Sequence, residues 1–188
     1  MYKQLFLLLY RLSVYPEKTW KELSGKQEEY SREEFYRGYL YPLFGLIALF
    51  SFIGVFISRK EFVVDVALKM MIKDLLTYFS AFYLSSFALT KLLISVFRFP
   101  AERYVVERFT GYSSAVIYLV SILYSLFPSF FFLPILMLYT VYIIWQGAVF
   151  YLKLDESNWV KFTIFASVLI ILLPKILDFI IALIMPGL

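Results

Sequence analysis

The chain has 188 residues, of which 62% are hydrophobic and 21% aromatic, and its mean hydropathy is +0.77. A soluble domain is nearer half apolar, so this composition favours a polytopic membrane protein. The sequence holds no cysteine and no histidine, which excludes disulfides, thiol nucleophiles, Cys or His metal sites and histidine-based acid–base catalysis. The net charge of +4 is small, and its placement bears on membrane topology rather than on nucleic-acid binding.

Residues 1–39 are predicted to form an N-terminal arm. Residues 1–15 are apolar but too short to span a bilayer, so we expect either a helix lying along the headgroups or a simple packing segment. Pro16 suits the first position of a second helix, and Trp20 is placed like an interfacial anchor. Charges of both signs follow over residues 21–37, three or four apart, which indicates a solvated helix face or a docking surface.

The rest of the chain, residues 40–188, is predicted to be a domain of five transmembrane helices. Their approximate limits are 40–58, 75–97, 111–127, 131–152 and 159–184. The predicted fold class is therefore all-α, a polytopic membrane protein with an N-terminal amphipathic or interfacial helical arm. We expect a charged connector over residues 61–74 and a basic loop over residues 98–110.

Small residues and prolines predict how these spans pack. Gly54 and Ser58 form a small-xxx-small pair that favours close approach of another helix. The short turn Phe127-Pro128-Ser129-Phe130 predicts that spans three and four form an antiparallel hairpin. Pro174 is expected to kink the fifth span, because its ring removes one backbone donor and clashes one turn back.

Three ionisable residues are predicted to lie at membrane depth: Lys91, Lys175 and Asp178. Lys91 is close enough to the end of its span to snorkel, or it faces a cavity or a carboxylate. Lys175 and Asp178 are three residues apart on one helix face, so they can pair with each other, or they lie at the outer headgroups. A charge at this depth costs at least ~2.5–3.5 kcal/mol, which suggests a function by default. Lys73 and Asp74 in the connector are further candidates.

The distribution of Lys and Arg predicts the orientation. Five spans put twelve of these residues on the N-terminal side and five on the other, with Lys91 inside a span. The positive-inside rule then places the N-terminus in the cytosol and the C-terminus on the opposite side. No phosphate-binding loop, HExxH motif or carboxylate pair at ligand spacing occurs, which favours a non-enzyme without catalytic residues, metal or cofactor.

Three short motifs, in this order, resemble the Yip1-domain family of five-span membrane proteins over nearly the whole chain. They are Tyr15-Pro16-Glu17-Lys18-Thr19-Trp20, Tyr39-Leu40-Tyr41-Pro42-Leu43-Phe44 and Gly111-Tyr112-Ser113. The first is similar to the arm of prokaryotic members, which implies a bacterial inner membrane. Eukaryotic members carry Asp-Leu-Tyr-Gly-Pro before the first span and bind Rab-type small GTPases. Here Gly38-Tyr39-Leu40-Tyr41-Pro42 lacks that Asp and that Gly, which speaks against the eukaryotic role.

The first functional hypothesis is a non-catalytic membrane adaptor or scaffold that organises partners or lipids. Its candidate partner- or lipid-binding residues are Trp20, Arg103, Arg108, Gly111 and Tyr112. Gly111 is expected to allow a tight transition from loop to helix, since glycine tolerates positive φ. Arg103 and Arg108 are expected to meet anionic headgroups or an acidic partner.

The alternative hypothesis is a small transporter, channel or lipid-handling protein. It predicts that Lys91, Lys175 and Asp178 converge on a polar cavity between spans two and five. Membrane lipids are the expected partners under either hypothesis, together with a protein on the cytosolic side or a second copy of the chain, and no nucleic acid.

Overall fold

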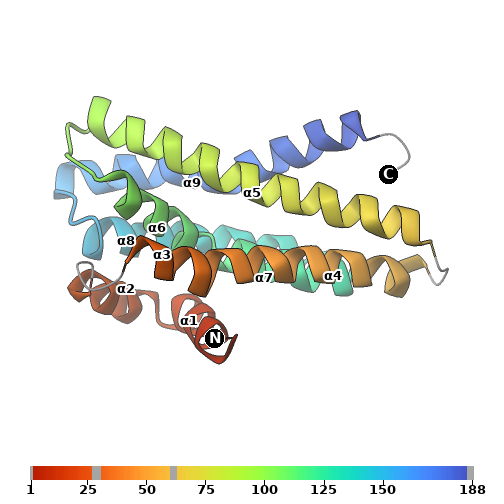
Figure 1. Cartoon of the computed structure of the whole chain (residues 1–188). Helices are drawn as coiled ribbons and strands as arrows, with labels where there is room; N and C mark the ends of the chain where they lie inside the picture. The colour runs from red at the N-terminus through yellow and green to blue at the C-terminus, as the bar shows by residue number, and fades with distance from the viewer. Residues whose placement is uncertain (1, 27–30, 60–62, 186–188) are drawn as a thin grey trace.

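The computed structural model describes residues 2–26, 31–59 and 63–185, and every regular element in these ranges is a helix (Figure 1). The predicted all-α class is therefore confirmed. Long helices run side by side in a bundle, and two short helices form an arm that packs against one flank of it (Figure 1).

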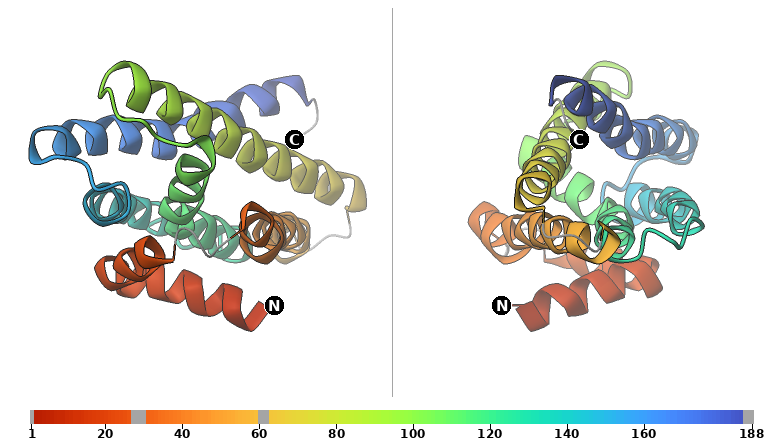
Figure 2. Two further views of the ribbon diagram at one scale, coloured as in Figure 1. Left: turned by 60° about the vertical axis from the view of Figure 1, so that its left-hand side comes forward. Right: turned by 90° about the vertical axis from the view of Figure 1, so that its right-hand side faces the viewer.

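The arm consists of α1 (Tyr2–Val14) and α2 (Pro16–Gly25). Pro16 occupies the first turn of α2 as predicted, where its missing N–H needs no partner. One face of α1 is buried through Leu5, Leu9 and Leu12. Its remaining surface carries exposed apolar side chains, among them Phe6, Leu7, Tyr10 and Val14. Figure 1 views α1 nearly end-on, and Figure 2 shows it crossing the long direction of the bundle, as a helix along a membrane surface would.

A continuous helical run follows the arm. Its parts are α3 (Arg32–Phe35), the π-helix η1 (Tyr36–Leu40) and α4 (Tyr41–Arg59). A capping box starts the run, because Ser31 Oγ accepts from the Glu34 N–H and the Glu34 carboxylate accepts from the Ser31 N–H. The predicted boundary between arm and membrane domain, at residues 39 and 40, lies inside this run.

The next helix, α5 (Val64–Ser95), has 32 residues and returns beside α4. The predicted connector over residues 61–74 is helical from Val64 onward, and its residues 61 and 62 lie outside the described residues. Its charges stabilise a helix instead, since Lys69 Nζ lies 3.1 Å from Asp65 Oδ2 at a spacing of four. We call the end of the bundle where α3 begins and α5 ends the arm end, and the opposite end the far end.

The third pass is broken into α6 (Arg103–Ser113) and α7 (Ala115–Leu126), which meet at an angle of 41°. Gly-Tyr-Ser therefore ends α6 rather than opening a span, and most of the predicted basic loop is helical. Hydroxyls of Thr110 and Ser114 donate to the carbonyls four residues earlier, which is typical of bent helices. Figure 2 shows α6 standing across the inside of the bundle.

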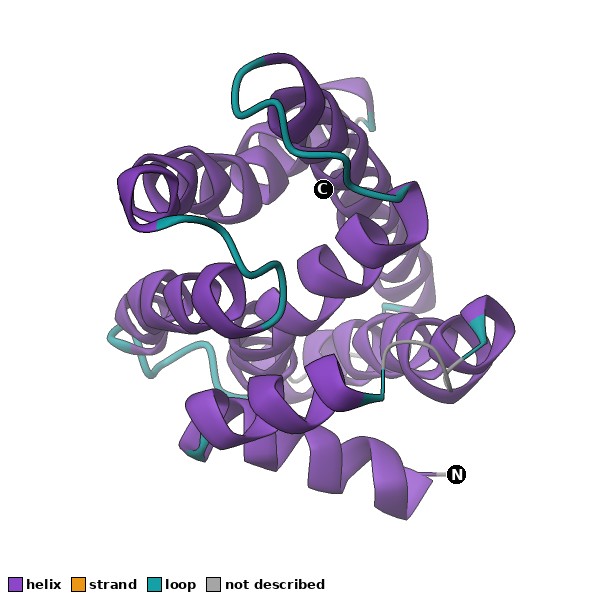
Figure 3. Cartoon of the chain, turned by 90° about the vertical axis from the view of Figure 1, so that its left-hand side faces the viewer, coloured by secondary structure: helices purple, strands orange, loops and turns teal. Residues whose placement is uncertain are grey.

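The last two passes are a 3₁₀-helix η2 (Leu133–Tyr139) continuing into α8 (Thr140–Phe150), and α9 (Glu156–Ile184). Pro174 lies inside α9, which continues on both sides of it. Figure 3 views the bundle from the end at which α9 begins, with the arm below it.

Several helices are suited to a membrane. Among the described residues, three helical stretches are long and apolar enough to cross one: Arg32–Ser58, Leu133–Phe150 and Glu156–Ile184. The bent pair α6–α7 makes a fourth if it counts as one span. These stretches indicate a membrane protein, and the number of five spans stays a prediction.

Candidate functional site

The segment at the centre of the arm end is α6, in which every residue from Val106 to Ser113 is buried. The chain enters α6 at the bundle surface and runs inward, so a stretch expected to be an exposed basic loop lies among the other helices (Figure 2). Two of these buried residues, Glu107 and Arg108, are charged. Because an uncompensated buried charge is very unfavourable, their surroundings decide what this site can do.

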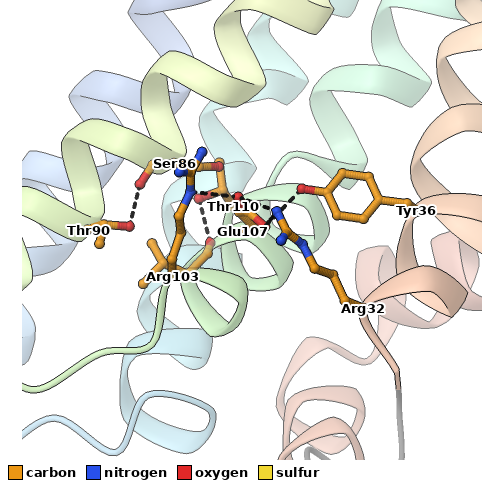
Figure 4. Close-up of polar contacts among 8 residues, drawn as sticks. Arg32, Tyr36, Ser86, Thr90, Arg103, Glu107 and Thr110 are labelled. Carbon is orange, nitrogen blue, oxygen red and sulfur yellow. Dashed lines mark hydrogen bonds and ion pairs between the residues drawn. The ribbon is translucent and has the colours of Figure 1, made fainter.

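Glu107 is the acceptor at the centre of a cluster that joins α6 to the start of the first span (Figure 4). Its carboxylate accepts from Arg103 Nε at 3.0 Å and from the Tyr36 hydroxyl at 2.8 Å, and Arg32 Nη2 lies 3.2 Å away. The Glu107 side chain is 1% exposed, whereas those of Arg32 and Arg103 are 60% and 63% exposed. The two arginines therefore neutralise a buried carboxylate while remaining hydrated themselves.

This cluster holds the helices together rather than leaving a reactive group. Arg32 and Tyr36 come from α3 and η1, and Glu107 with Arg103 from α6. Three donors bond this one carboxylate, which compensates for its burial. In the same region the Tyr39 hydroxyl donates to the carbonyl of Gly111 at 3.2 Å. The π-helix η1 thus places Tyr36 and Tyr39 against α6.

Trp20 fastens the arm to this centre. Its side chain is 0% exposed, and its ring lies 5.7 Å from Phe109, 6.1 Å from Tyr112 and 5.1 Å from Tyr151 between centroids. The indole Nε1–H donates to the Ile143 carbonyl at 3.0 Å. The prediction of an interfacial anchor is wrong, because aromatic side chains of α6 and of Tyr151, directly after α8, bury this ring away from lipid and partner alike.

Two glycines allow this close packing. A Cβ on Gly111 would lie 2.6 Å from Phe35 Cζ, and one on Gly147 would lie 2.7 Å from Phe109 and 2.9 Å from Trp20. Gly111 lies in the body of α6 and shows no positive φ, so its predicted role in a loop-to-helix transition is wrong. Its small size, rather than its conformational freedom, is what the site requires.

A groove of about 640 Å³ lies between the arm and the α3–η1 segment. Its floor is apolar and includes Leu5, Leu8, Phe35, Tyr39 and Tyr112. Its rim is charged, with Arg11, Glu22, Lys26, Glu33, Glu34 and Arg37. Arg11 also bonds Glu22, which joins α1 to α2 and lowers the pKa of that carboxyl. The predicted site residue Tyr112 thus lines an open groove.

The two arginines predicted to meet headgroups or a partner, Arg103 and Arg108, lie in different environments. Arg103 is exposed and its Nε bonds Glu107, whereas Arg108 is 3% exposed with its guanidinium 5.1 Å from the Tyr104 ring centroid. Arg108 is therefore placed away from headgroups and partners, contrary to prediction. Sequence reasoning missed Glu107 as a site residue, although Arg103 precedes it by four, the spacing of a helical ion pair.

A second, polar cavity of about 320 Å³ lies at the far end, between α4, α5, α7 and α9. Lys175 and Asp178 both line it, as the alternative hypothesis predicted. Asp178 pairs with Lys73 at 2.6 Å rather than with Lys175, and Lys73 Nζ also lies 3.4 Å from Asp74. Lys91 is exposed near the other end of α5, 5.7 Å from the Phe87 ring, so it does not join them.

Comparison with known proteins gives one match. A family model described as the Yip1 domain matches residues 10–177. No curated protein sequence and no solved structure matches the chain. The matched range contains Trp20, the Glu107 cluster and every residue that lines the far-end cavity except Asp178.

Proposed function

The chain belongs to the Yip1-domain family, and on that premise we propose that it is a non-catalytic membrane adaptor or scaffold that docks a partner in the groove of its arm. The observation that carries this proposal is the attachment of the arm. Trp20 and the Glu107 cluster fix α2 and α3 to the bundle, so the groove between them has a fixed shape before any partner arrives. A preformed groove binds with a smaller entropic cost than a mobile arm would.

The side chains that line the groove indicate the chemistry of a partner that would fit it. An apolar floor beneath a rim of both charge signs suits an amphipathic helix that buries leucine-like side chains and pairs its flanking charges with the rim. On the rim, Arg37 and Glu33 pair with each other at 2.8 Å while remaining 77% and 66% exposed, so both remain accessible. The excess of Lys and Arg on this side of the chain favours a cytosolic partner.

Three features favour a non-catalytic role. Without histidine or cysteine, a nucleophile has to come from a hydroxyl, amine or carboxylate side chain, and a general base from carboxylates, lysines or tyrosines. The buried carboxylate of the arm end, Glu107, is already occupied by three donors. Within the described ranges, no three acidic side chains gather as metal ligands would.

Photocrosslinking in native membranes tests the adaptor proposal. One probe replaces Leu8 on the floor and another Arg37 on the rim, with Phe179 on the far half of α9 as the control position, since it is 65% exposed and distant from the groove. We expect one discrete protein adduct at both groove positions and none at Phe179. Adducts to lipid alone, or to a second copy of the chain, contradict the proposal.

A matched pair of glycine variants sharpens this test. Gly38 lines the groove and Gly45 lies on α4 outside it, and a Cβ at either glycine would meet nothing within 4 Å. Gly38→Phe is therefore expected to fill the groove and abolish the Leu8 adduct, whereas Gly45→Phe leaves the adduct in place. Equal loss in both variants would show that the adduct does not report on the groove.

Lipid handling is the second candidate function, and the far-end cavity favours it. Lys73, Asp74, Lys175 and Asp178 all line this cavity among hydroxyl side chains. Four ionisable groups around one cavity of a membrane protein are costly to maintain without a polar occupant. A site of this kind at the end of a bundle suits the headgroup of a lipid.

A further inference from the structure

We propose that the far-end cavity binds a phospholipid headgroup carrying both a phosphate and a primary ammonium, which is phosphoethanolamine chemistry, from the leaflet opposite the arm. This inference rests on the second candidate function and gives it a substrate class. It is independent of the groove at the arm end, which lies at the other end of the bundle (Figure 1).

The depth of the cavity matches a headgroup. Its lining on α4 extends from Ser51 to Ser58, next to the last residue of that helix. Seven residues of helix rise about 10 Å, which corresponds to the headgroup layer and the first carbons of the acyl chains. Pro128 and Pro134 line the cavity where the chain turns between α7 and η2, giving it an apolar side toward the surrounding lipid.

The carboxylates of the cavity provide a place for an ammonium. Lys73 serves two carboxylates at once, with Nζ 2.6 Å from Asp178 and 3.4 Å from Asp74. These three residues together carry one excess negative charge. Asp74 also accepts from Ser51 Oγ at 2.6 Å, whereas Asp178 is 43% exposed and forms no other bond among the described residues. The Asp178 carboxylate is therefore the group with acceptor capacity left for a ligand.

Lys175 provides the complementary charge for a phosphate. It lies one turn before Asp178 on α9, lines the same cavity, and makes no ion pair within the described part of the chain. A cation and a carboxylate one turn apart, unpaired with each other, match a headgroup whose phosphate and ammonium are separated by two carbons. A purely anionic headgroup could pair with Lys175, but it would leave the one excess negative charge of Lys73, Asp74 and Asp178 without a cation.

An independent observation indicates that the occupant is polar. Thr77 lines the cavity and is 2% exposed, yet its Oγ1 has no hydrogen-bond partner among the described residues. A buried hydroxyl without a partner costs about 1–3 kcal/mol, so a ligand that bonds Thr77 recovers this free energy. Hydroxyl and carboxylate acceptors suit the three N–H groups of a primary ammonium. A quaternary choline has no such donors and is bound by aromatic cages instead.

Native mass spectrometry of the delipidated full chain in detergent tests the proposal. The protein is offered equal amounts of phosphatidylethanolamine, phosphatidylcholine and phosphatidylglycerol with identical acyl chains. We expect about tenfold preferential retention of phosphatidylethanolamine over phosphatidylcholine. Thr77→Val and Lys175→Gln are each expected to lower that retention roughly three- to tenfold, the range expected for one hydrogen bond. Lys91→Gln, outside the cavity, is the matched control and is expected to leave it unchanged.

Thr77→Val keeps the test decisive, because it removes no hydrogen bond within the protein and preserves the side-chain shape. Equal retention of all three lipids overturns both the inference and the second candidate function. Preference for phosphatidylglycerol or phosphatidylcholine overturns the inference alone. If both cavity variants retain phosphatidylethanolamine as the wild type does, the lipid does not bind in this cavity and the inference is overturned. Loss of that retention in Gly38→Phe leads to the same conclusion. Free O-phosphoethanolamine that binds without selective lipid retention contradicts a lipid source.

Discussion

The indole N–H of Trp20 donates to the backbone carbonyl of Ile143, 123 residues further along the chain, at 3.0 Å. This bond joins α2 of the arm to α8 inside the bundle. It is accompanied by the stacking of Trp20 on Phe109 and by the absence of a side chain at Gly147, which makes room for the ring. The arm is therefore an integral part of the folded core.

Removing the Trp20 ring is expected to free the arm. Trp20→Ala should lower the free energy of unfolding by about 3–5 kcal/mol, as for other large buried aromatic side chains. Trp20→Phe should cost less, because most of the ring packing survives and one hydrogen bond of about 1 kcal/mol is lost. Unfolding by denaturant gives these values, and trypsin cleavage after Lys21 reports release of α2. Equal resistance to trypsin in Trp20→Ala and the wild type would contradict the arm's attachment through this residue.

Gly147→Ala is expected to act on the same contact. The added Cβ would approach Phe109 and Trp20 to within 3 Å, and overpacking of this kind costs about 1–3 kcal/mol. Because both substitutions act at one contact, their costs should not add, and Trp20→Ala should reduce the penalty of Gly147→Ala by removing one of the two clashing rings. Strict additivity in the double variant would show that the two residues do not share a contact.

The Glu107 cluster predicts an asymmetric response to substitution. Arg32→Gln or Arg103→Gln alone should cost less than about 1 kcal/mol, because each arginine is mostly hydrated and the other still pairs with the carboxylate. The double variant leaves a buried carboxylate without either cation and should cost about 3 kcal/mol, more than the two single costs together. A thermodynamic double-mutant cycle in detergent measures the difference. An additive result would mean that each arginine contributes independently of the other.

Two glycines on α4 form a matched pair for a packing test. A Cβ on Gly54 would lie 2.1 Å from the Ser125 carbonyl oxygen, so Gly54→Ala requires α4 and α7 to separate and should cost about 3 kcal/mol. A Cβ on Gly45 meets nothing within 4 Å, so Gly45→Ala should be neutral or stabilise the helix by up to about 1 kcal/mol. Equal effects on the thermal midpoint would contradict the close helix approach at Gly54.

In the far-end cavity, Lys73 is expected to contribute more to the free energy of unfolding than Asp178. Lys73→Gln leaves two carboxylates, Asp74 and Asp178, without their shared cation, and should cost about 3 kcal/mol. Asp178→Asn should cost about 1 kcal/mol, because Asp178 is partly exposed and Lys73 retains Asp74. Unfolding free energies of the two variants, compared with that of Lys91→Gln, measure this order. The reverse order would mean that Asp178, not Lys73, holds the cluster together.

The broad class of the protein could be predicted from composition and local pattern. Apolar runs long enough to cross a bilayer predicted a helical membrane protein, and the helical stretches of the structure confirm the class. Pro16 marked the start of α2, because a proline in a first turn is a local property of the backbone. The close approach predicted at Gly54 is confirmed as well, with α7 as the neighbouring helix.

The interior of the arm end could not be predicted in this way. Glu107 and Arg108 lie in a charged stretch, and the prediction of an exposed loop followed from charge alone. The burial of Glu107 depends on Arg32 and Tyr36, which are 75 and 71 residues from it in the sequence. Trp20 likewise looked like an interfacial residue from the sequence. Its burial could not be predicted, because its hydrogen-bond partner is a backbone carbonyl of another helix. Local periodicity carries no information about such distant partners.

The separation of Trp20 and Ile143 by 123 residues in the sequence has a consequence during biosynthesis. The docking position of Trp20 does not exist until Ile143 and the rest of α8 have left the ribosome and entered the bundle. At about 5–20 residues per second, translation of the intervening 123 residues takes roughly 6–25 s. Throughout that interval α2 of the arm lacks α8, the helix against which it packs, so the membrane surface or a chaperone has to shield its apolar side chains.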